Sequence, residues 1–221
     1  MNLIHSLILL ALGTTPLGAA TLHVAASFQD NTTAGWTAGA PNPQKPSIVQ
    51  DTGPSGPGDH HLAVFASGTA GPGGRLATFN ESPPWTGNYS ATGITHLTAD
   101  LRNIGGGTLT VRVALDGPGG RYSTTTTAVL PTPSLWTPVS FSLAPNELVH
   151  VPGTGSGNPL DTLANVSQLR IIHNPVPAFK AIASPASLAV DNLSLIPEPS
   201  TTLLLTLTFA SVALSRRLPL W

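Results

Sequence analysis

Asp191 is the most informative candidate for a functional side chain, because the alternation of apolar and polar residues in its strand shifts by one position here. A β-bulge produces such a slip and can aim a carboxylate and free carbonyl oxygens at one point. Two interpretations stay open: a cluster of oxygen ligands, or a carboxylate that only accepts backbone hydrogen bonds within its own bulge. The slip falls across Asp191–Asn192, between the apolar residues Leu188 and Val190 and the apolar residues Leu193 and Leu195.

Aromatic side chains offer a second kind of chemistry, since sugar-binding proteins stack exposed aromatic rings on pyranose faces. Trp85 and Tyr89 follow two consecutive prolines in a loop-like stretch and are the best candidates for such a platform. The alternative is that these rings only pack against the loop or the core. Trp36 and Trp136 each begin a strand region, which favours a place in the core.

Catalytic and metal-binding patterns are weak elsewhere in the chain. His60 and His61 are neighbours at a strand start, so their side chains point to opposite faces and do not easily bind one ion. Glycoside hydrolysis needs two carboxylates roughly 5 to 10 Å apart, yet Asp100 and Asp116 each have the pattern of an outward-facing residue. The sequence contains no cysteine and no Gly-x-Ser-x-Gly elbow. We therefore predict a protein that is not an enzyme.

The elements that must position these residues are short runs with a period of two, which is typical of strands with one buried face. Leu97 to Leu101 and Leu109 to Leu115 are two such runs around Gly105-Gly106-Gly107, which predicts an antiparallel hairpin. No helical period extends over ten residues in the body, although 146–151 and 160–165 each have room for one turn. Further strand-like runs lie at 47–51, 61–66, 75–79, 121–130, 139–143, 166–173 and 186–195.

About eight to ten strands separated by Gly/Pro turns predict an all-β fold, an antiparallel β-sandwich or barrel, over residues 21–196. Two of the turns nearly repeat each other. The first reads Gly71-Pro72-Gly73-Gly74-Arg75, and the second reads Gly117-Pro118-Gly119-Gly120-Arg121. The repeat indicates similar turn chemistry, because glycine adopts positive φ without steric cost. A duplicated binding site is the alternative.

The two ends of the predicted domain, residues 21–196, resemble those of jelly-roll carbohydrate-binding domains of the galactose-binding type. The opening segment is Phe28-Gln29-Asp30 followed by Gly35-Trp36, and the closing segment runs from Val190 to Leu195. The resemblance implies a jelly roll. It also implies a structural Ca²⁺ between the first and last strands, with Asp30 and Asp191 as carboxylate ligands and backbone carbonyls completing the shell.

The composition limits the partners and the sources of stability. Charged residues make up 9% of the 221 residues, and the net charge is −1. Without a run of basic residues, the sequence predicts no nucleic-acid partner. Cysteine is absent, so stability must come from the buried core, with a metal as a further contribution.

Residues 1–20 have the pattern of a secretory signal peptide. An apolar run from Leu7 to Leu12 precedes the small residues Gly18-Ala19-Ala20, which predicts a mature chain beginning near Thr21. The first six residues contain no lysine or arginine, so an uncleaved N-terminal helix is the alternative.

Residues 197–221 combine a polar tripeptide, an apolar segment and a basic stop. Pro197-Glu198-Pro199 precedes the uncharged, leucine-rich segment 200–215, and Arg216-Arg217 follow it. As a helix, the segment would span about 24 Å, somewhat short of a ~30 Å hydrocarbon core, although flanking arginines can snorkel. The arginines favour a cytoplasmic C-terminus.

This order of features resembles the PEP-CTERM sorting signal of bacterial envelope proteins. The resemblance implies that the segment enters the inner membrane transiently and that an exosortase, a membrane protease, cuts the chain near residues 197–199. An ordinary single-pass anchor is the alternative. We predict an exported protein of the cell envelope or extracellular matrix that associates with exopolysaccharide. A carbohydrate-binding module with a defined sugar site is the first alternative, and a hydrolase is the second.

Overall fold

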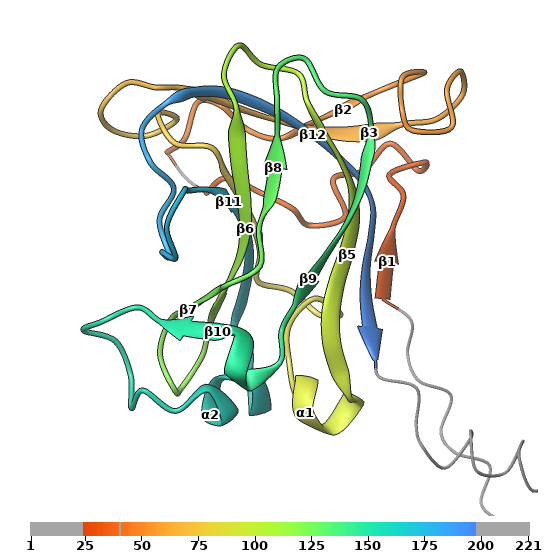
Figure 1. Cartoon of the computed structure of the whole chain (residues 1–221). Helices are drawn as coiled ribbons and strands as arrows, with labels where there is room; N and C mark the ends of the chain where they lie inside the picture. The colour runs from red at the N-terminus through yellow and green to blue at the C-terminus, as the bar shows by residue number, and fades with distance from the viewer. Residues whose placement is uncertain (1–23, 40, 198–221) are drawn as a thin grey trace, which may run out of the picture.

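The computed structural model describes residues 24–39 and 41–197, which form two antiparallel sheets packed face to face (Figure 1). Sheet A has the order β2–β3–β12–β5–β9, with β1 paired to β12. Its strands are β1 (Val24–Ala26), β2 (Ser47–Val49), β3 (His61–Ser67), β5 (Ile94–Asn103), β9 (Thr137–Ser142) and β12 (Pro185–Pro197).

Sheet B has the order β10–β7–β6–β11–β4, with β8 paired to β6. Its strands are β4 (Ala77–Asn80), β6 (Leu109–Asp116), β7 (Tyr122–Thr124), β8 (Ala128–Leu130), β10 (Leu148–His150) and β11 (Gln168–His173). The predicted all-β sandwich is confirmed. Apolar residues at alternate positions of the strands fill the space between the sheets, as in Leu97, Leu101, Val111, Val113 and Val190, each at most 1% exposed.

The hairpin predicted between 97–101 and 109–115 is wrong. Strand β5 pairs with β12 and β9 in sheet A, whereas β6 pairs with β11, β7 and β8 in sheet B. The glycine turn therefore carries the chain across the sandwich. Buried Asn103 holds this crossing, because its Nδ2 donates to the carbonyls of Gly107 (2.7 Å) and Leu130 (3.0 Å). Strands that face each other across a core have the same apolar alternation as a hairpin.

Three short helical turns complete the fold: α1 (Tyr89–Thr92), the 3₁₀ turn η1 (Pro145–Glu147) and α2 (Pro159–Ala164). Helix α2 matches the turn predicted at 160–165, and Asn158 caps it by accepting a hydrogen bond from the Leu160 amide at 3.1 Å. The helical turn predicted at 146–151 is present in part: η1 ends at Glu147, and strand β10 follows directly.

The described chain begins and ends at the same end of the sandwich, where β1 lies beside the last part of β12 (Figure 1). Strand β12 includes Pro197, which pairs with Ile94. The predicted signal peptide and the remainder of the predicted sorting signal, including Glu198, Pro199, Arg216 and Arg217, lie outside the described residues. Within residues 24–39 and 41–197, no helix has the length and apolar character needed to span a membrane.

Candidate functional site

The bulge predicted at Asp191–Asn192 is present. The register of β12 against β5 shifts between Asp191 and Ser194, and Asn192 has a φ of 48°, a left-handed conformation that is uncommon for a residue other than glycine. The Asp191 side chain is fully buried. Its Oδ1 accepts a hydrogen bond from the Asn192 amide at 2.7 Å, while its Oδ2 has no partner among the described residues.

The carboxylates whose charges affect Asp191 are those of Asp59 and Asp100, not that of the predicted partner Asp30. Burial raises the pKa of Asp191 to about 7, and the neighbouring charges of Asp59 and Asp100 raise it as well. Asp30 is exposed, and its carboxylate accepts hydrogen bonds from the amide (3.0 Å) and hydroxyl (2.9 Å) of Thr32. No three acidic or histidine side chains form a metal cluster in the part of the chain that the structure describes. Calcium ligation by Asp30 and Asp191 stays a prediction.

Trp85 and Tyr89 lie in the core rather than on a loop surface. Their exposed fractions are 3% and 1%, the Tyr89 hydroxyl donates to the Trp85 carbonyl, and Trp85 packs edge-on against Trp36 at 5.2 Å between ring centroids. Neither ring therefore has a face free to stack on a sugar. Pro83 and Pro84, the residues that suggest a loop, precede helix α1, and the side chain of Tyr89 in this helix is buried.

The outer face of sheet B collects the polar and aromatic side chains that could bind a ligand. Because Leu109, Val111, Val113 and Leu115 of β6 point into the core, the residues between them point outward. The same alternation turns Gln168 and Arg170 of β11 and Phe79 of β4 outward. This surface is the candidate functional site.

A loop formed by residues 174–184, here called the cover loop, crosses part of this face between β11 and β12. Its Phe179 and Ala181 are buried against Ala114 of β6 and Ile172 of β11. Arg112 of β6 lies beneath the loop, where it donates to the carbonyls of Asn174 (3.1 Å) and Pro175 (3.0 Å). It also donates to those of Thr124 (2.6 Å), the last residue of β7, and Thr125 (3.1 Å), which follows it. Arg112 therefore positions the loop and is not available to a ligand.

Two other arginines stack on the aromatic ring that the cover loop supplies. The Cζ atoms of Arg121 and Arg170 lie 4.4 Å and 4.2 Å from the centroid of Phe179, and Arg170 lies 4.8 Å from the centroid of Phe79. Such cation–π contacts fix the planes of the two guanidinium groups.

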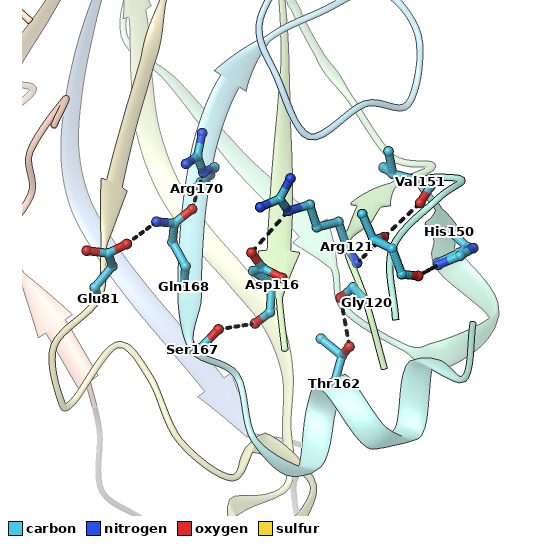
Figure 2. Close-up of polar contacts among 11 residues, drawn as sticks. Glu81, Asp116, Gly120, Arg121, His150, Val151, Thr162, Ser167, Gln168 and Arg170 are labelled. Atoms are coloured by element: carbon cyan, nitrogen blue, oxygen red, sulfur yellow. Dashed lines mark hydrogen bonds and ion pairs between the residues drawn. The ribbon is translucent and has the colours of Figure 1, made fainter. Parts of the chain in front are cut away.

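Polar contacts on the sheet also hold these arginines, as Figure 2 shows. The Nε of Arg121 donates to Asp116 at 3.1 Å. The Nε of Arg170 donates to Gln168, which in turn donates to Glu81. Within the described chain, the terminal nitrogens of both guanidinium groups have no protein acceptor. Each arginine is thus held at Nε and keeps its outer donors for a ligand.

The electrostatic setting of Arg170 is cationic. Burial lowers the pKa of Arg170, the nearby Arg121 lowers it further, and the negative charges of Asp116 and Glu81 offset part of this effect. A guanidinium group remains charged in proteins despite such shifts. Two positive groups therefore lie close together on one face.

Beside Arg170, the outer face of sheet B is hollowed into a groove of about 580 Å³. A volume of this order is typical of small-ligand sites. Phe79 and Arg170 line the groove from the sheet, Lys180 lines it from the cover loop, and Arg75 lines it from the segment before β4. The remaining lining consists of Ala77 of β4 and of six loop residues: Ala38, Pro41, Asn42, Gly71, Pro72 and Gly73. We call this feature the sheet B groove.

The repeated turns place an arginine each on this face. In both turns the amide of the fourth residue donates to the carbonyl of the first, at 3.3 Å for Gly74–Gly71 and 2.9 Å for Gly120–Gly117. The predicted similarity is therefore present only in part: the turns share this hydrogen bond, but positive φ falls at Gly71 and Gly73 in the first turn and at Gly120 in the second. Arg75, which follows the first turn, enters the sheet B groove, and Arg121, which follows the second, stacks on Phe179.

The two carboxylates considered for hydrolysis lie on different sheets. Asp100 belongs to β5 of sheet A, where its carboxylate accepts a hydrogen bond from Asn192 at 2.8 Å. Asp116 belongs to β6 of sheet B and pairs with Arg121. Because both side chains point outward from opposite faces of the sandwich, they do not form a catalytic pair.

Comparison with known proteins gives the fold of this chain and no family. No protein-family model and no curated protein matches the sequence. Solved structures do match. A family 11 carbohydrate-binding module of a cellulosomal cellulase from Clostridium thermocellum has 16% identity and a TM-score of 0.53, over 81% of this chain and 96% of that chain.

Two further matches are parts of larger enzymes. An exo-β-agarase has 12% identity and a TM-score of 0.54, over 79% of this chain and 24% of the agarase. The CBM22-1–GH10 modules of endo-1,4-β-D-xylanase 10B from Clostridium thermocellum have 14% identity and a TM-score of 0.50, over 80% of this chain and 28% of that chain. At these identities the likeness shows a shared β-sandwich fold.

Proposed function

We propose that this chain is an exported, non-catalytic polysaccharide-binding protein of the bacterial cell envelope, and that the outer face of sheet B is its binding surface. The observation that carries the proposal is the sheet B groove, which combines the half-exposed ring of Phe79 with the unpaired donors of Arg170. Sugar-binding sites need this combination, because a pyranose offers an apolar face to a ring and hydroxyl oxygens to hydrogen-bond donors.

The shared fold supports this proposal. One of the similar structures, a family 11 carbohydrate-binding module, is a complex with a β-1,3-1,4-mixed-linked tetrasaccharide; its TM-score is 0.54 at 16% identity. A β-sandwich of this kind can therefore bind an oligosaccharide.

The outer face of sheet A is a weaker candidate. It has a shallow depression of about 480 Å³, but no aromatic side chain lines it. Its lining residues are Thr98, Ala99, Asp100, Pro138, Val139, Ser140 and Asn192. Without a ring for stacking, this depression lacks the apolar contact that orients a sugar.

The proposal includes the sorting route implied by the C-terminal resemblance. A signal peptide over residues 1–20 directs export, and residues 200–215 hold the chain in the inner membrane. An exosortase then recognises Pro197-Glu198-Pro199 and releases the body to the cell surface or the surrounding exopolysaccharide. A single-pass anchor that is never cut is the alternative outcome.

The proposal also includes a structural Ca²⁺ at Asp191. The unpartnered Oδ2 of this buried carboxylate supports it, because an anionic oxygen without a donor is costly unless a cation or proton neutralises it. Asp59 and Asp100 add negative charge at the same place. Asp30 retains lone pairs beyond its bonds to Thr32, so the predicted pair of ligands stays part of the proposal.

Affinity electrophoresis tests the binding function. The full chain, in a detergent without a sugar headgroup, is run through gels containing mixed-linked β-glucan, agarose, polygalacturonate or exopolysaccharide from the native host. We expect retardation by at least one polysaccharide and its loss in Phe79→Ala. Phe65→Ala is the matched control, since Phe65 is also half-buried but belongs to sheet A. Unretarded migration in every gel, or equal effects of both variants, would contradict the proposal.

A further inference from the structure

The distribution of charge over the fold carries information about the ligand. The chain contains only nine lysines and arginines. Five of these nine side chains gather on one face, although no two of them are adjacent in sequence. They are Arg75, Arg112, Arg121, Arg170 and Lys180, all at the outer face of sheet B or in the segments that border it.

Neutralising groups are absent from the lining of the sheet B groove. Arg75, Arg170 and Lys180 line it, and no carboxylate does. Arg75 donates one terminal nitrogen to the Ala181 carbonyl at 2.7 Å and keeps the other. Within the described residues, the exposed Lys180 ammonium makes no hydrogen bond and no ion pair with protein. The groove therefore presents three cations, none of which forms an ion pair within the described residues, although Asp116 and Glu81 offset part of the charge at Arg170.

The acidic residues of the molecule lie elsewhere or are already engaged. Asp116 is bound by Arg121, and Glu81 accepts from Gln168. Asp100 and Asp191 belong to strands β5 and β12 of sheet A, and Asp59 lies just before β3 of the same sheet. The fold thus separates a cationic face on sheet B from an anionic region on sheet A, although the net charge of the chain is only −1.

The backbone of two glycine-rich turns positions two of these arginines, Arg75 and Arg121. Arg75 and Arg121 each follow a Gly-Pro-Gly-Gly turn that leads into a strand of sheet B. A side chain could not easily replace these glycines: an added Cβ on Gly74 would lie 1.7 Å from the Thr69 carbonyl oxygen, and one on Gly120 would lie 2.5 Å from that of Thr154. Close packing therefore restricts the backbone of each turn, and the arginine that follows each turn lies at the outer face of sheet B.

We propose that the sheet B groove binds an anionic polysaccharide, one that carries carboxylate or sulfate groups on its sugar units. The inference rests on the proposed function and specifies its ligand. Arg75, Arg170 and Lys180 bind the anionic groups, because guanidinium forks match the oxygens of carboxylates and sulfates. Phe79 contacts the apolar face of the sugar ring. Arg121, next to Arg170 on Phe179, extends the cationic track beyond the groove.

A sugar acid fits this site better than a nucleic acid does. Nucleic-acid surfaces track many phosphates along a basic stripe and commonly stack bases on exposed aromatic rings. The three groove cations instead surround one concave site of about 580 Å³ with one half-exposed ring. This geometry suits a short stretch of charged sugar units.

The test compares polysaccharides that differ only in charge. Isothermal titration calorimetry with the full chain, in a polyoxyethylene detergent, uses polygalacturonate against its fully methyl-esterified form, and a sulfated galactan against the same galactan after desulfation. We expect at least tenfold tighter binding to one charged member than to its neutral partner. The preferred pair distinguishes carboxylate from sulfate. This preference should weaken as salt rises, because salt screens exposed charges over about 10 Å at 0.1 M.

Two variants test whether the preference for charged polymers depends on the sheet B groove. Lys180→Gln should weaken binding of the charged polymer by up to about fivefold, the upper end for one exposed charge pair, and leave the neutral polymer unaffected. Arg102→Gln, on sheet A, is the matched control and should change neither affinity. Melting temperatures verify that both variants fold.

The outcomes separate this inference from the function on which it rests. Equal binding of the charged and neutral members of both pairs would overturn the anionic specificity and leave polysaccharide binding intact. Binding of none of the four polymers, together with no retardation in the gels above, would overturn both. Equally tight binding of double-stranded DNA would also overturn the inference, since the face would then attract any polyanion without recognising sugar.

Discussion

Asp191 is the residue whose environment is hardest to satisfy in the folded protein. Its carboxylate is fully buried, and one oxygen has no donor among the described residues. The folded molecule must therefore protonate this group, bind a cation to it, or accept a loss of stability.

The pH dependence of stability should reveal the protonated form when divalent cations are absent. The folded-state pKa of about 7 lies above the ordinary value of 3.8, so folding favours the protonated carboxyl. The resulting stability is fully present below about pH 4 and is lost as the pH rises through 7. Melting temperatures measured in EDTA should fall over this range for the native chain. The Asp191→Asn variant should show a flatter profile, and an identical slope in both proteins would show that Asp191 does not titrate in this way.

Calcium should stabilise the native chain through the same residue at neutral pH. An ion that binds only the folded state adds about 2.7 kcal/mol at one hundred times its Kd. We expect EDTA to lower the melting temperature and millimolar Ca²⁺ to restore it. Asp191→Ala should abolish this response, while Asp116→Ala, on the opposite sheet, should retain it. A melting temperature indifferent to EDTA would leave Asp191 as a bulge residue without a metal.

Arg112 is the residue on which the cover loop depends. It donates to four backbone carbonyls, two of them in the loop, at distances from 2.6 to 3.1 Å. Because Arg112→Met removes the donor of all four bonds, two of which are buried, we expect a loss of about 3 kcal/mol in the free energy of unfolding by urea. Arg102→Met removes a single bond of 3.3 Å to Ser134 and should cost less than about 1 kcal/mol. Similar losses in both variants would contradict the role of Arg112.

At the scale of elements, glycine turns determine which segments can approach one another. The second Gly-Pro-Gly-Gly turn packs against α2, and a Cβ on Gly119 would lie 2.0 Å from the Asn158 carbonyl oxygen. Gly106, in the turn between the two sheets, has no atom within 4 Å of the same position. These two glycines therefore have different structural roles despite similar sequence surroundings.

Alanine substitution should separate the two roles. Gly119→Ala forces a backbone shift and should lower the free energy of unfolding by about 1–3 kcal/mol. Gly106→Ala meets no steric barrier and should change stability by no more than about 1 kcal/mol, with stabilisation expected because alanine restricts the unfolded chain. Urea unfolding of both variants provides the comparison. Equal destabilisation would mean that α2 does not pack as closely on this turn as the structure shows.

The sequence identifies strands better than it identifies their partners. Alternation located the strands at 61–66, 166–173 and 186–195, because each strand buries one face in any sandwich. The same alternation does not distinguish a hairpin from two strands that face each other across the core, so it wrongly predicts β5 and β6 in one sheet. Strands β1 and β10, with three residues each, are too short to show a period.

The candidate site was harder to predict because its parts are distant in sequence. The Asp191 bulge was predictable, since a phase slip is a local signal. The loop-like context of Trp85 and Tyr89 predicts exposed rings and does not reveal that both rings pack inward. The cationic face joins Arg75, Arg121, Arg170 and Lys180, which no run of basic residues connects. The repeated Gly-Pro-Gly-Gly-Arg sequence was the one signal that pointed to it.

At the scale of the whole molecule, residues 24–197 contain both sheets and the core between them. We expect this segment, expressed alone, to fold as a monomer. Far-UV circular dichroism should show mainly strand, with helix below about a fifth of the residues, since the described helices are single turns. A larger helix content, or a disordered chain, would contradict the architecture.

The proposed sorting route can be tested by mass. If an exosortase processes the chain, the mature protein from the native host should lack the residues that follow Pro197-Glu198-Pro199. Replacing Pro197 and Pro199 by alanine should then leave the full-length form in the membrane fraction. Intact-mass measurement that finds Trp221 on the mature native protein would favour the single-pass anchor instead.

The most direct test of the account is to locate the glycan on the molecule. Backbone amide resonances of isotopically labelled residues 24–197 are followed during titration with a mixed-linked glucan tetrasaccharide and, separately, with an oligogalacturonate. We predict saturable shifts for amides of β4, β11 and the cover loop, around Phe79, Arg170 and Lys180, and none on the outer face of sheet A. The absence of a saturable shift with either saccharide, or shifts centred on Asp100 and Asn192, would contradict sheet B as the binding face.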